Sequence, residues 1–402
     1  MLVHGARIQH HFLYDCNRPT KHAEETAMRI VEMITFLSAA AVFTAGPVEA
    51  KQLLYLASTQ EKTIVAYEID EPAGSLTKRF SVNLPGNLGP LAFSPDRSYI
   101  YAAMTGLADG KAGVATLRRA SNGTLKLLAT ATITTRAPYI RTDKQGKFLL
   151  AAHYGAGDVT VYEIVDGICT DKLLDHKVTE KTAHCIEIDP SGQFVFVPHT
   201  SPNKVYQFRL NQSTGQLTPN SPPFVSGPDT EHKYHEPRHY AHHPTLDVAY
   251  TSNENGGGIT AWRFDPQRGT LSEMQTLSTL PPDYQGGSAA ADIQITPNGR
   301  FAYVSNRDVT ERAEGEPMRD TLAAVALDPN TGRMKLAGYF PTAHFPRSFC
   351  IDLTGQFAYS AGQKSATLFA YRIDQSTGRL EHVQTYETGG VPIWVMCGQV
   401  GK

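Results

Sequence analysis

The sequence predicts an all-β protein, a seven-bladed β-propeller closed by pairing of its N- and C-terminal strands. Three observations lead to this fold class. A unit of four short strands recurs along residues 51–402, a glycine marks the last turn of each copy, and no helical period follows residue 50. A four-stranded repeat of about 40 to 50 residues is typical of a propeller blade. The marker glycines are Gly74, Gly123, Gly167, Gly215, Gly269, Gly332 and Gly378.

The two ends of the repeat region indicate how the ring closes. The first copy, "LLYLASTQEKTIVAYEID", lacks an inner strand and its turn, whereas the final "VPIWVMC" is an inner strand with nothing after it. We therefore expect the last strand to complete the blade that the first strand begins. Such closure removes the free sheet edges that invite aggregation.

The N-terminal region does not follow the repeat. From Met28 the chain has one arginine, an apolar run over 34–45 and small residues before Ala50. This run is too short to span a bilayer but is typical of a signal peptide. We hypothesise that residues 1–27 are an upstream extension outside the natural protein, that 28–50 are a signal peptide, and that the mature chain is periplasmic or secreted. The alternative is a cytoplasmic protein with an N-terminal helix.

The composition of the chain limits the kinds of partner that we expect. The chain is 41% hydrophobic and 19% charged, with a formal net charge of -2 and no long basic run. This composition is compatible with a soluble enzyme. It gives no indication that the protein binds nucleic acid, or that it contacts a membrane after the signal peptide is removed. The five cysteines form no C-x-x-C pair, so we expect free and mostly buried thiols. The oligomeric state is left open.

The stretch "HEPRH" at 235–239 resembles the H-E-x-x-H zinc pattern, which requires a helix to place both histidines on one face. Here it begins the inner strand of the fifth copy, and Pro237 pushes Glu236 out of the α region. On a strand the two histidines are about 13 Å apart, and Arg238 is expected to face away from His235 and His239. We predict no metal and no cofactor, although a looser site around His232, His235 or His242 stays open.

Polar residues gather where inner strands begin and second strands end, and these places adjoin in an antiparallel pair. The inner-strand starts carry His184, Arg238 and Arg347, and the second-strand ends carry His153, His199, Glu254 and Arg307. We expect them around one mouth of the central channel, where arginines can bind an anion and a histidine or glutamate can take a proton. The alternative is a set of structural salt bridges between blades.

At these residues the sequence resembles the seven-bladed lactonase family, which includes propeller-type 6-phosphogluconolactonases and carboxy-cis,cis-muconate cyclases. The resemblance covers about residues 51–399 and rests on "HCIEIDPSGQFVFVP", "EPRHYAHHP" with "AYTSNENGGGITAW", "ADIQITPNGRFAYVSNR" and "FPRSFCIDLTGQFAYSAGQ". It implies a functional set of His184, Arg238, Glu254 and Arg307. Arg347, His153, His199 and Asn306 are the expected substrate contacts. The chain departs from the family pattern at Thr182, His153, His199 and Glu236.

Three functions remain open from the sequence. The first is a metal-independent lactonase for a sugar or related lactone, with His184 or Glu254 as general base and Arg238 and Arg307 holding the anionic group and the oxyanion. The second is a lyase or cycloisomerase that takes a proton beside a carboxylate with the same base. The third is a non-catalytic propeller that binds partners, which predicts a mouth filled by mutual salt bridges without an open pocket.

Overall fold

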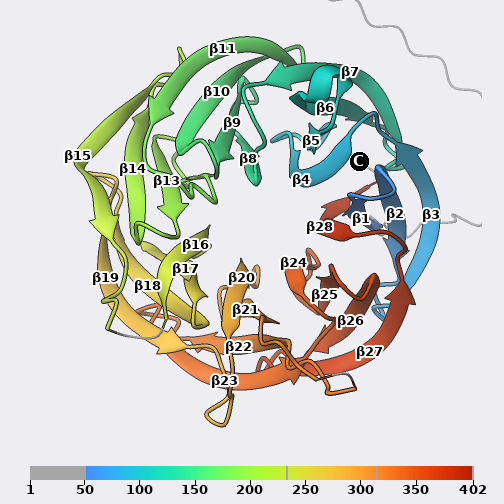
Figure 1. Cartoon of the computed structure of the whole chain (residues 1–402), viewed down its shortest axis with the longest axis vertical. Helices are drawn as coiled ribbons and strands as arrows, with labels where there is room; N and C mark the ends of the chain where they lie inside the picture. Colours follow the sequence, from blue (N-terminus) through green and yellow to red (C-terminus); the bar gives the residue numbers. More distant parts are fainter. Residues whose placement is uncertain (1–50, 232–233, 314, 401–402) are drawn as a thin grey trace, which may run out of the picture. The chain divides into compact units, whose positions relative to one another are not determined.

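The computed structural model describes residues 51–231, 234–313 and 315–400, so the predicted extension, the predicted signal peptide, Cys16 and His232 lie outside the described residues. Within that part the chain is all β, apart from one short 3-10 helix, η1 (Ala108–Gly110). The strands form seven antiparallel four-stranded blades arranged around a channel (Figure 1). The predicted fold class is confirmed.

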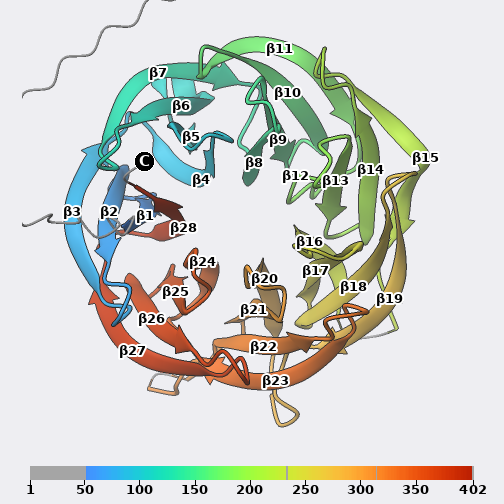
Figure 2. The ribbon, with the colours of Figure 1, turned by 180° about the vertical axis from the view of Figure 1, so that it is seen from behind.

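In each blade one edge strand lies nearest the axis of the ring and the other edge strand lies at its outside (Figures 1 and 2). From the inner to the outer strand the blades are β28 (Pro392–Gln399), β1 (Gln52–Ser58), β2 (Thr63–Ile69), β3 (Leu76–Asn83); β4 (Asn87–Phe93), β5 (Tyr99–Thr105), β6 (Ala112–Arg119), β7 (Leu125–Ile133); β8 (Tyr139–Thr142), β9 (Phe148–His153), β10 (Asp158–Val165), β11 (Ile168–Val178); β12 (Glu187–Ile188), β13 (Phe194–His199), β14 (Lys204–Leu210), β15 (Leu217–Ser226); β16 (His235–His242), β17 (Val248–Asn255), β18 (Gly258–Asp265), β19 (Thr270–Ser278); β20 (Ser288–Ile295), β21 (Phe301–Asp308), β22 (Thr321–Leu327), β23 (Met334–Pro341); and β24 (Pro346–Ile351), β25 (Phe357–Gly362), β26 (Thr367–Ile373), β27 (Leu380–Glu387).

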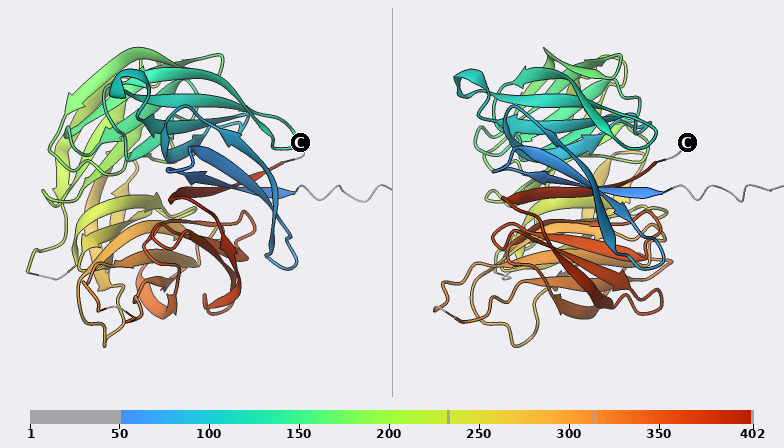
Figure 3. Two further views of the ribbon diagram at one scale, coloured as in Figure 1. Left: turned by 45° about the vertical axis from the view of Figure 1, so that its right-hand side comes forward. Right: turned by 90° about the vertical axis from the view of Figure 1, so that its right-hand side faces the viewer.

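The first blade takes its inner strand from the other end of the chain. β28 pairs antiparallel with β1, from Gln52 opposite Gln399 to Ala57 opposite Trp394. The two strands lie side by side in both views of Figure 3. The pairing that the sequence predicted therefore supplies the missing strand.

The core lies between neighbouring blades, on both faces of each second strand. β1, β9, β13, β21 and β25 are buried along their whole length, because both of their faces pack against the adjacent blades. Every marker glycine has a positive φ, between 67° and 83°. At Gly269 the φ is +69°, and an added Cβ would lie 1.9 Å from the Phe194 ring of the preceding blade. The glycine thus permits both the turn and the contact between blades.

Tyrosine hydroxyls tie several blades to these turns. Tyr250 donates to the carbonyl of Gly332 at 2.7 Å, and Tyr303 donates to the carbonyl of Gly378 at 2.8 Å. Both tyrosines are fully buried, so each hydrogen bond satisfies a hydroxyl that would otherwise lack a partner in the core. The repeated glycine is therefore a packing position and a hydrogen-bond acceptor as well as a turn.

Bulges interrupt several inner strands near their starts. The register shifts between Pro237 and Tyr240 in β16 and between Pro346 and Ser348 in β24, with similar shifts in β4 and β20. A bulge inserts an extra residue and re-aims side chains, so the strict alternation of a strand fails there. The expectation that Arg238 faces away from His239 is therefore wrong: both line the same cavity.

Among the described residues no helix is long and apolar enough to cross a membrane. The four cysteines within this part, Cys169, Cys185, Cys350 and Cys397, are free and buried, as the sequence predicted for them.

Candidate active site

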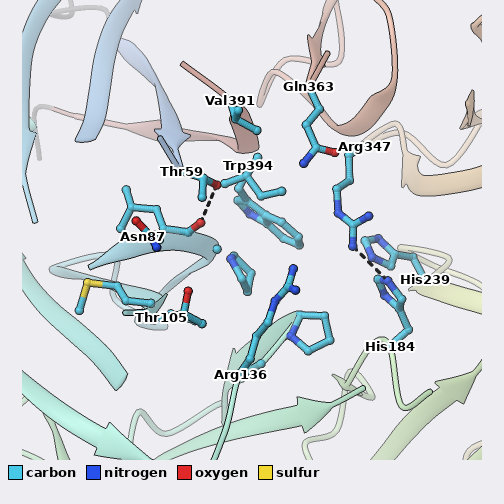
Figure 4. Close-up of a pocket in the computed structure, with 18 of the residues that line it drawn as sticks. Thr59, Asn87, Thr105, Arg136, His184, His239, Arg347, Gln363, Val391 and Trp394 are labelled. Carbon is cyan, nitrogen blue, oxygen red and sulfur yellow. Dashed lines mark hydrogen bonds between the residues drawn. The ribbon is translucent and has the colours of Figure 1, made fainter. Parts of the chain in front are cut away.

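A cavity of about 220 Å³ opens at the end of the channel where the inner strands begin. We call it the main cavity. His184, His239 and Arg347 lie on one side, and Trp394 and Asn87 lie across from them (Figure 4). Arg238 also lines this cavity. A neighbouring side cavity of about 440 Å³ is lined by Tyr154, Glu254, Arg136, Arg347 and His184 among others. The two share Arg136, Pro138, His184 and Arg347, so they form one continuous region at this mouth.

Three of the predicted residues reach the main cavity from the starts of three inner strands. His184 precedes β12, where its backbone N–H donates to the Pro198 carbonyl at 3.0 Å. Arg238 lies in the bulge of β16 and Arg347 in the bulge of β24. The strand-end reasoning from the sequence therefore placed these side chains correctly, and their convergence follows from the antiparallel register of each blade.

Each of these three residues follows, by two positions, a non-glycine residue with a left-handed backbone. The φ values are +71° at Thr182, +69° at Glu236 and +62° at Phe345. A non-glycine residue in this region costs on the order of 1–3 kcal/mol, and such strain clusters at functional sites. Glu236 is one of these strained positions, and a glycine there would adopt the same backbone angle without a clash from Cβ.

Glu254, at the end of β17, is held by two arginines. Its Oε1 accepts a hydrogen bond from Nη2 of Arg307 at 2.5 Å and lies 3.4 Å from Nε of Arg238. Burial alone would raise the pKa of Glu254, but the nearby Arg238 and Arg307 guanidinium groups outweigh it and lower that pKa. Glu254 is therefore a carboxylate at neutral pH, fixed as an anchor for two cations.

Arg307 and Asn306 lie next to each other on β21 but do not line either cavity. Arg307 donates to the carbonyls of Ala289 and Ala290, both at 3.1 Å, in addition to its contact with Glu254. The amide of Asn306 donates to the Thr279 carbonyl at 2.9 Å and accepts from the hydroxyl of the same residue at 2.8 Å. Arg307 thus orients Glu254, and Asn306 holds a loop.

His153 and His199 are fully buried within their own blades and line neither the main nor the side cavity. Nε2 of His153 bonds the Thr160 hydroxyl at 2.7 Å, and Nε2 of His199 bonds the Thr179 hydroxyl at 2.9 Å. Burial lowers the pKa of His199 to about 4. Both side chains point into the blade rather than into the channel mouth, so neither belongs to the candidate site.

Several buried nitrogens of the main cavity have no hydrogen-bond partner within the described part of the chain. They are Nδ1 of His184, Nε2 of His239, and Nε, Nη1 and Nη2 of Arg238. Arg238 is completely inaccessible and carries the charge of a guanidinium whose pKa is lowered by burial and by the other arginines. Buried polar groups are nearly always satisfied in folded proteins, so such a cluster indicates a place for a ligand.

His239 is a site residue that the sequence reasoning missed. It lines the main cavity, and its Nδ1 lies 2.9 Å from Oδ1 of the buried Asp292 on β20. Its ring contacts Tyr139 at 5.2 Å and Trp394 at 6.1 Å between centroids. Trp394 and Tyr139 also line a larger cavity of about 680 Å³ at the ends of the inner strands. These three rings therefore lie between the two ends of the channel.

A signal for His239 and Trp394 was present in the sequence. Pro237, Pro346 and Pro392 occupy equivalent positions, each opposite the end of a second strand. Two residues after these prolines come His239, Ser348 and Trp394. Aligning the prolines would have placed His239 and Trp394 at the mouth, whereas Arg136 and Tyr154 come from loops that the repeat does not specify.

The zinc interpretation of "HEPRH" is not supported by the backbone, because the segment forms β16 rather than a helix. Glu236 has a φ of +69°, which no right-handed helix contains. Within residues 51–231, 234–313 and 315–400 no group of three or more His, Cys, Asp or Glu side chains is arranged to hold a metal ion. His232, one of the three histidines of the looser site, lies outside these ranges.

Comparison with known proteins agrees with the fold. Residues 53–397 match the family model "Lactonase, 7-bladed beta-propeller". The 6-phosphogluconolactonase of Serratia proteamaculans is 33% identical over 347 residues, which is 86% of this chain and 98% of that protein. The 6-phosphogluconolactonase of Yersinia pestis is 32% identical over 346 residues, covering 86% and 97% of the two chains.

Solved structures share the fold. The periplasmic gluconolactonase PpgL of Pseudomonas aeruginosa superposes with a TM-score of 0.75 at 22% identity, over 87% of this chain and 99% of that one. A protein from Lactobacillus plantarum gives a TM-score of 0.75 at 24% identity, over 87% and 99%. The match to the family model spans nearly every described residue, and the chain belongs to the seven-bladed β-propeller lactonase family.

Proposed function

We propose that the protein hydrolyses a sugar or related lactone at the main cavity without help from a metal ion. One observation carries the proposal: unpartnered nitrogens of His184, Arg238 and His239 converge on a single cavity. Lactone hydrolysis needs a base to activate water and cations or N–H donors for the oxyanion. Relatives of this chain that are about a third identical are named 6-phosphogluconolactonase, which supports the same chemistry.

The charges of the main cavity favour an anionic substrate or transition state. Arg136, Arg238 and Arg347 line it, and among the described residues no aspartate or glutamate does. Burial and the neighbouring Arg307 lower the pKa of Arg347 only to about 10, so its charge persists at neutral pH. Arginine binds carboxylate and phosphate through two parallel hydrogen bonds. A carboxylate, a phosphate or a tetrahedral oxyanion satisfies these donors.

The opposite wall of the cavity suits the neutral part of a sugar. Trp394 is half-buried and presents an apolar ring, the amide side chain of Asn87 lies on the same side, and that of Gln363 lies beside Arg347 (Figure 4). An aromatic surface with a few amides and hydroxyls is a typical environment for a small polar ligand. We assign this wall to the hydroxylated carbons of the lactone.

The proposed roles follow from these contacts. Arg238 holds the oxyanion that forms when water attacks the lactone carbonyl, and Glu254 and Arg307 keep the Arg238 guanidinium in place. A histidine of the cavity takes the proton from the attacking water. Arg136 and Arg347 bind the acidic group of a charged substrate.

The non-catalytic alternative predicted a mouth closed by mutual salt bridges. Only Glu254 is paired in this way, whereas neither Arg136 nor Arg347 forms an ion pair among the described residues, and the cavity is open. This supports the enzyme over the scaffold. Of the two enzymatic alternatives, an unsaturated diacid product instead of a hydroxy acid would favour the lyase.

Export from the cytoplasm would limit the lactones that the enzyme can meet. We propose that the mature chain begins after Ala50 and leaves the cytoplasm, because the apolar run over 34–45 is typical of a signal peptide. A phosphorylated sugar lactone is a cytoplasmic metabolite, so an exported enzyme would meet an unphosphorylated one. N-terminal sequencing of the purified protein checks this proposal, and a chain that retains residue 1 contradicts it.

The test of activity compares 6-phosphogluconolactone and gluconolactone, with proton release followed in a pH-stat at several enzyme concentrations and with and without EDTA. We expect Arg238→Ala to lower kcat/KM by on the order of 10²- to 10³-fold, the usual effect of removing one oxyanion donor. Arg268→Ala, which removes a largely exposed guanidinium far from the cavity, is the matched control. Equal rates for wild type and Arg238→Ala would remove Arg238 from the mechanism, and loss of activity in EDTA would contradict a metal-free reaction.

A further inference from the structure

We infer that the two histidines of the main cavity share one tautomer but present opposite ring nitrogens to the cavity and have opposite catalytic roles: His239 takes the proton from water, and His184 donates a hydrogen bond to the developing oxyanion. This inference rests on the proposed hydrolase function and deepens it. It replaces the sequence-based hypothesis that His184 or Glu254 is the base.

The tautomer of His239 is fixed by Asp292. Nδ1 of His239 lies 2.9 Å from Oδ1 of Asp292, and a carboxylate can only accept, so Nδ1 carries the proton. Asp292 is itself held by the backbone N–H groups of Ile293, at 2.9 Å, and Phe349, at 3.2 Å. These bonds leave Nε2 of His239 with a lone pair, and that atom is buried at the cavity without a partner.

The tautomer of His184 is fixed by Arg347, which engages the other ring nitrogen. Nη2 of Arg347 lies 3.4 Å from Nε2 of His184, and Figure 4 shows the guanidinium pointing at the ring. A guanidinium can only donate, so Nε2 accepts and Nδ1 carries the proton. Nδ1 of His184 is also buried without a partner. The two imidazole rings thus offer the cavity one unsatisfied donor and one unsatisfied acceptor, and their centroids are 5.2 Å apart.

The surroundings keep both rings neutral. Burial and the Arg238 guanidinium lower the pKa of His239 to about 4, although Asp292 opposes the effect. Burial and Arg238 also lower the pKa of His184. The ionisable groups that face the two rings are Arg238, Arg347, Asp292, Tyr139 and Tyr154. Neutral imidazoles allow one nitrogen to accept a proton and the other to donate a hydrogen bond at neutral pH.

Glu254 is a poorer base than His239. Its Oε1 is already shared by Arg238 and Arg307, and these cations lower its pKa. A carboxylate that takes a proton there would leave two buried guanidinium groups without a counter-charge. Protonation of His239 removes no counter-charge from a neighbouring group, and its imidazolium would gain an ion pair with Asp292.

The reaction balances with these two groups. Water attacks the lactone carbonyl carbon as its proton passes to Nε2 of His239, and the carbonyl oxygen becomes an oxyanion facing Arg238 and the Nδ1–H of His184. When the tetrahedral intermediate collapses, the ring C–O bond breaks. The proton on His239 then passes to the departing oxygen, so the product is a hydroxy acid and both histidines return to their starting forms.

Two amide substitutions separate the roles, because the amide of asparagine lies near the Nδ1 position of histidine and that of glutamine near Nε2. His239→Gln retains a polar group but no base, so we expect kcat to fall by on the order of 10²- to 10⁴-fold. His184→Asn retains an N–H donor, so we expect a decrease of about 10-fold or less, while His184→Phe should lose on the order of 10²-fold or more. Circular dichroism and melting temperature check that each variant is folded.

Nitrogen-15 NMR of histidine-labelled protein gives a readout that does not need activity. Signals assigned by their loss in His239→Gln and His184→Asn should show an unprotonated Nε2 in His239 and in His184, with Nδ1 protonated in both. Asp292→Asn should abolish the fixed tautomer of His239 alone. A protonated Nε2 on His239 in the wild type, or a larger loss in His184→Asn than in His239→Gln, overturns the inference. If the wild type hydrolyses no lactone, the roles fall with the proposed function, and the NMR result alone decides the tautomers.

Discussion

Replacing Gly269 with alanine tests whether the marker glycine of each blade is required for packing as well as for its turn. Gly269 has a φ of +69°, and an added Cβ would lie 1.9 Å from Cδ1 and 2.3 Å from Cε1 of Phe194. The left-handed backbone costs an alanine about 1–2 kcal/mol. Displacing the buried Phe194 ring adds about 1–3 kcal/mol, the usual cost of overpacking a core. We therefore expect Gly269→Ala to destabilise the fold by about 2–5 kcal/mol.

Gly110→Ala is the matched control, because Gly110 has a φ of +71° but an added Cβ there meets nothing within 4 Å. It carries only the backbone cost of about 1–2 kcal/mol. The entropy that alanine removes from the unfolded chain is the same in both variants and cancels in the comparison. The difference between the two variants, about 1–3 kcal/mol, then measures the contact between the fourth and fifth blades.

Differential scanning calorimetry at neutral pH provides the measurement. At about 2 °C per kcal/mol, the lower slope for a large domain, Gly269→Ala should melt roughly 4–10 °C below wild type and Gly110→Ala roughly 2–4 °C below it. Equal melting temperatures for the two variants would show that the Phe194 ring moves aside without a loss of stability. In that case the glycines serve the turns alone, and the packing role that we give them is wrong.

Three further predictions concern the site. Glu254→Gln should lower the free energy of unfolding at pH 7 by about 2–3 kcal/mol, because two guanidinium groups lose their counter-charge; the partial exposure of Glu254 keeps the loss at the lower end. Since the pKa of Glu254 is lowered in the folded state, its contribution is present above about pH 4.5 and is lost on acidification. Wild type and variant should therefore converge in urea titrations near pH 3, and a difference that stays constant with pH would contradict this. Glu236→Gly should stabilise the fold by about 0.5–1 kcal/mol, because glycine relieves the left-handed backbone at a cost in chain entropy, and a lower melting temperature than wild type would argue against strain there. Trp394→Ala should raise KM for lactones at least several-fold with the fold retained, whereas unchanged kinetics would exclude Trp394 from the binding wall.

The sequence was sufficient for the architecture because the repeat imposes the same short-range pattern seven times. Turn glycines, apolar second strands and the split first blade each predict one feature, and these features agree with one another. The same repeat located His184, Arg238, Glu254 and Arg347 at one mouth, since equivalent strand ends in a ring face a common axis.

The errors came from residues whose direction the strand period does not determine. The bulge in β16 turns His239 into the cavity beside Arg238, which a period of two does not permit. His153 and His199 end their strands on the face that turns into the blade, so equivalence of position did not give equivalence of direction. Arg136 comes from a loop between blades, whose path no repeat specifies.

Ring closure by β28 makes the site depend on the completeness of the chain. The strand that carries Trp394 to the main cavity is synthesised after all the other described strands, and until it exists the inner edge of β1 lacks the partner that it has here. A chain that stops before residue 392 therefore lacks the closing strand and one wall of the cavity together. Pairing of β28 with β1 completes the cavity wall and covers the exposed sheet edge in one step. A partly made propeller of this kind therefore has neither a complete cavity nor a protected edge.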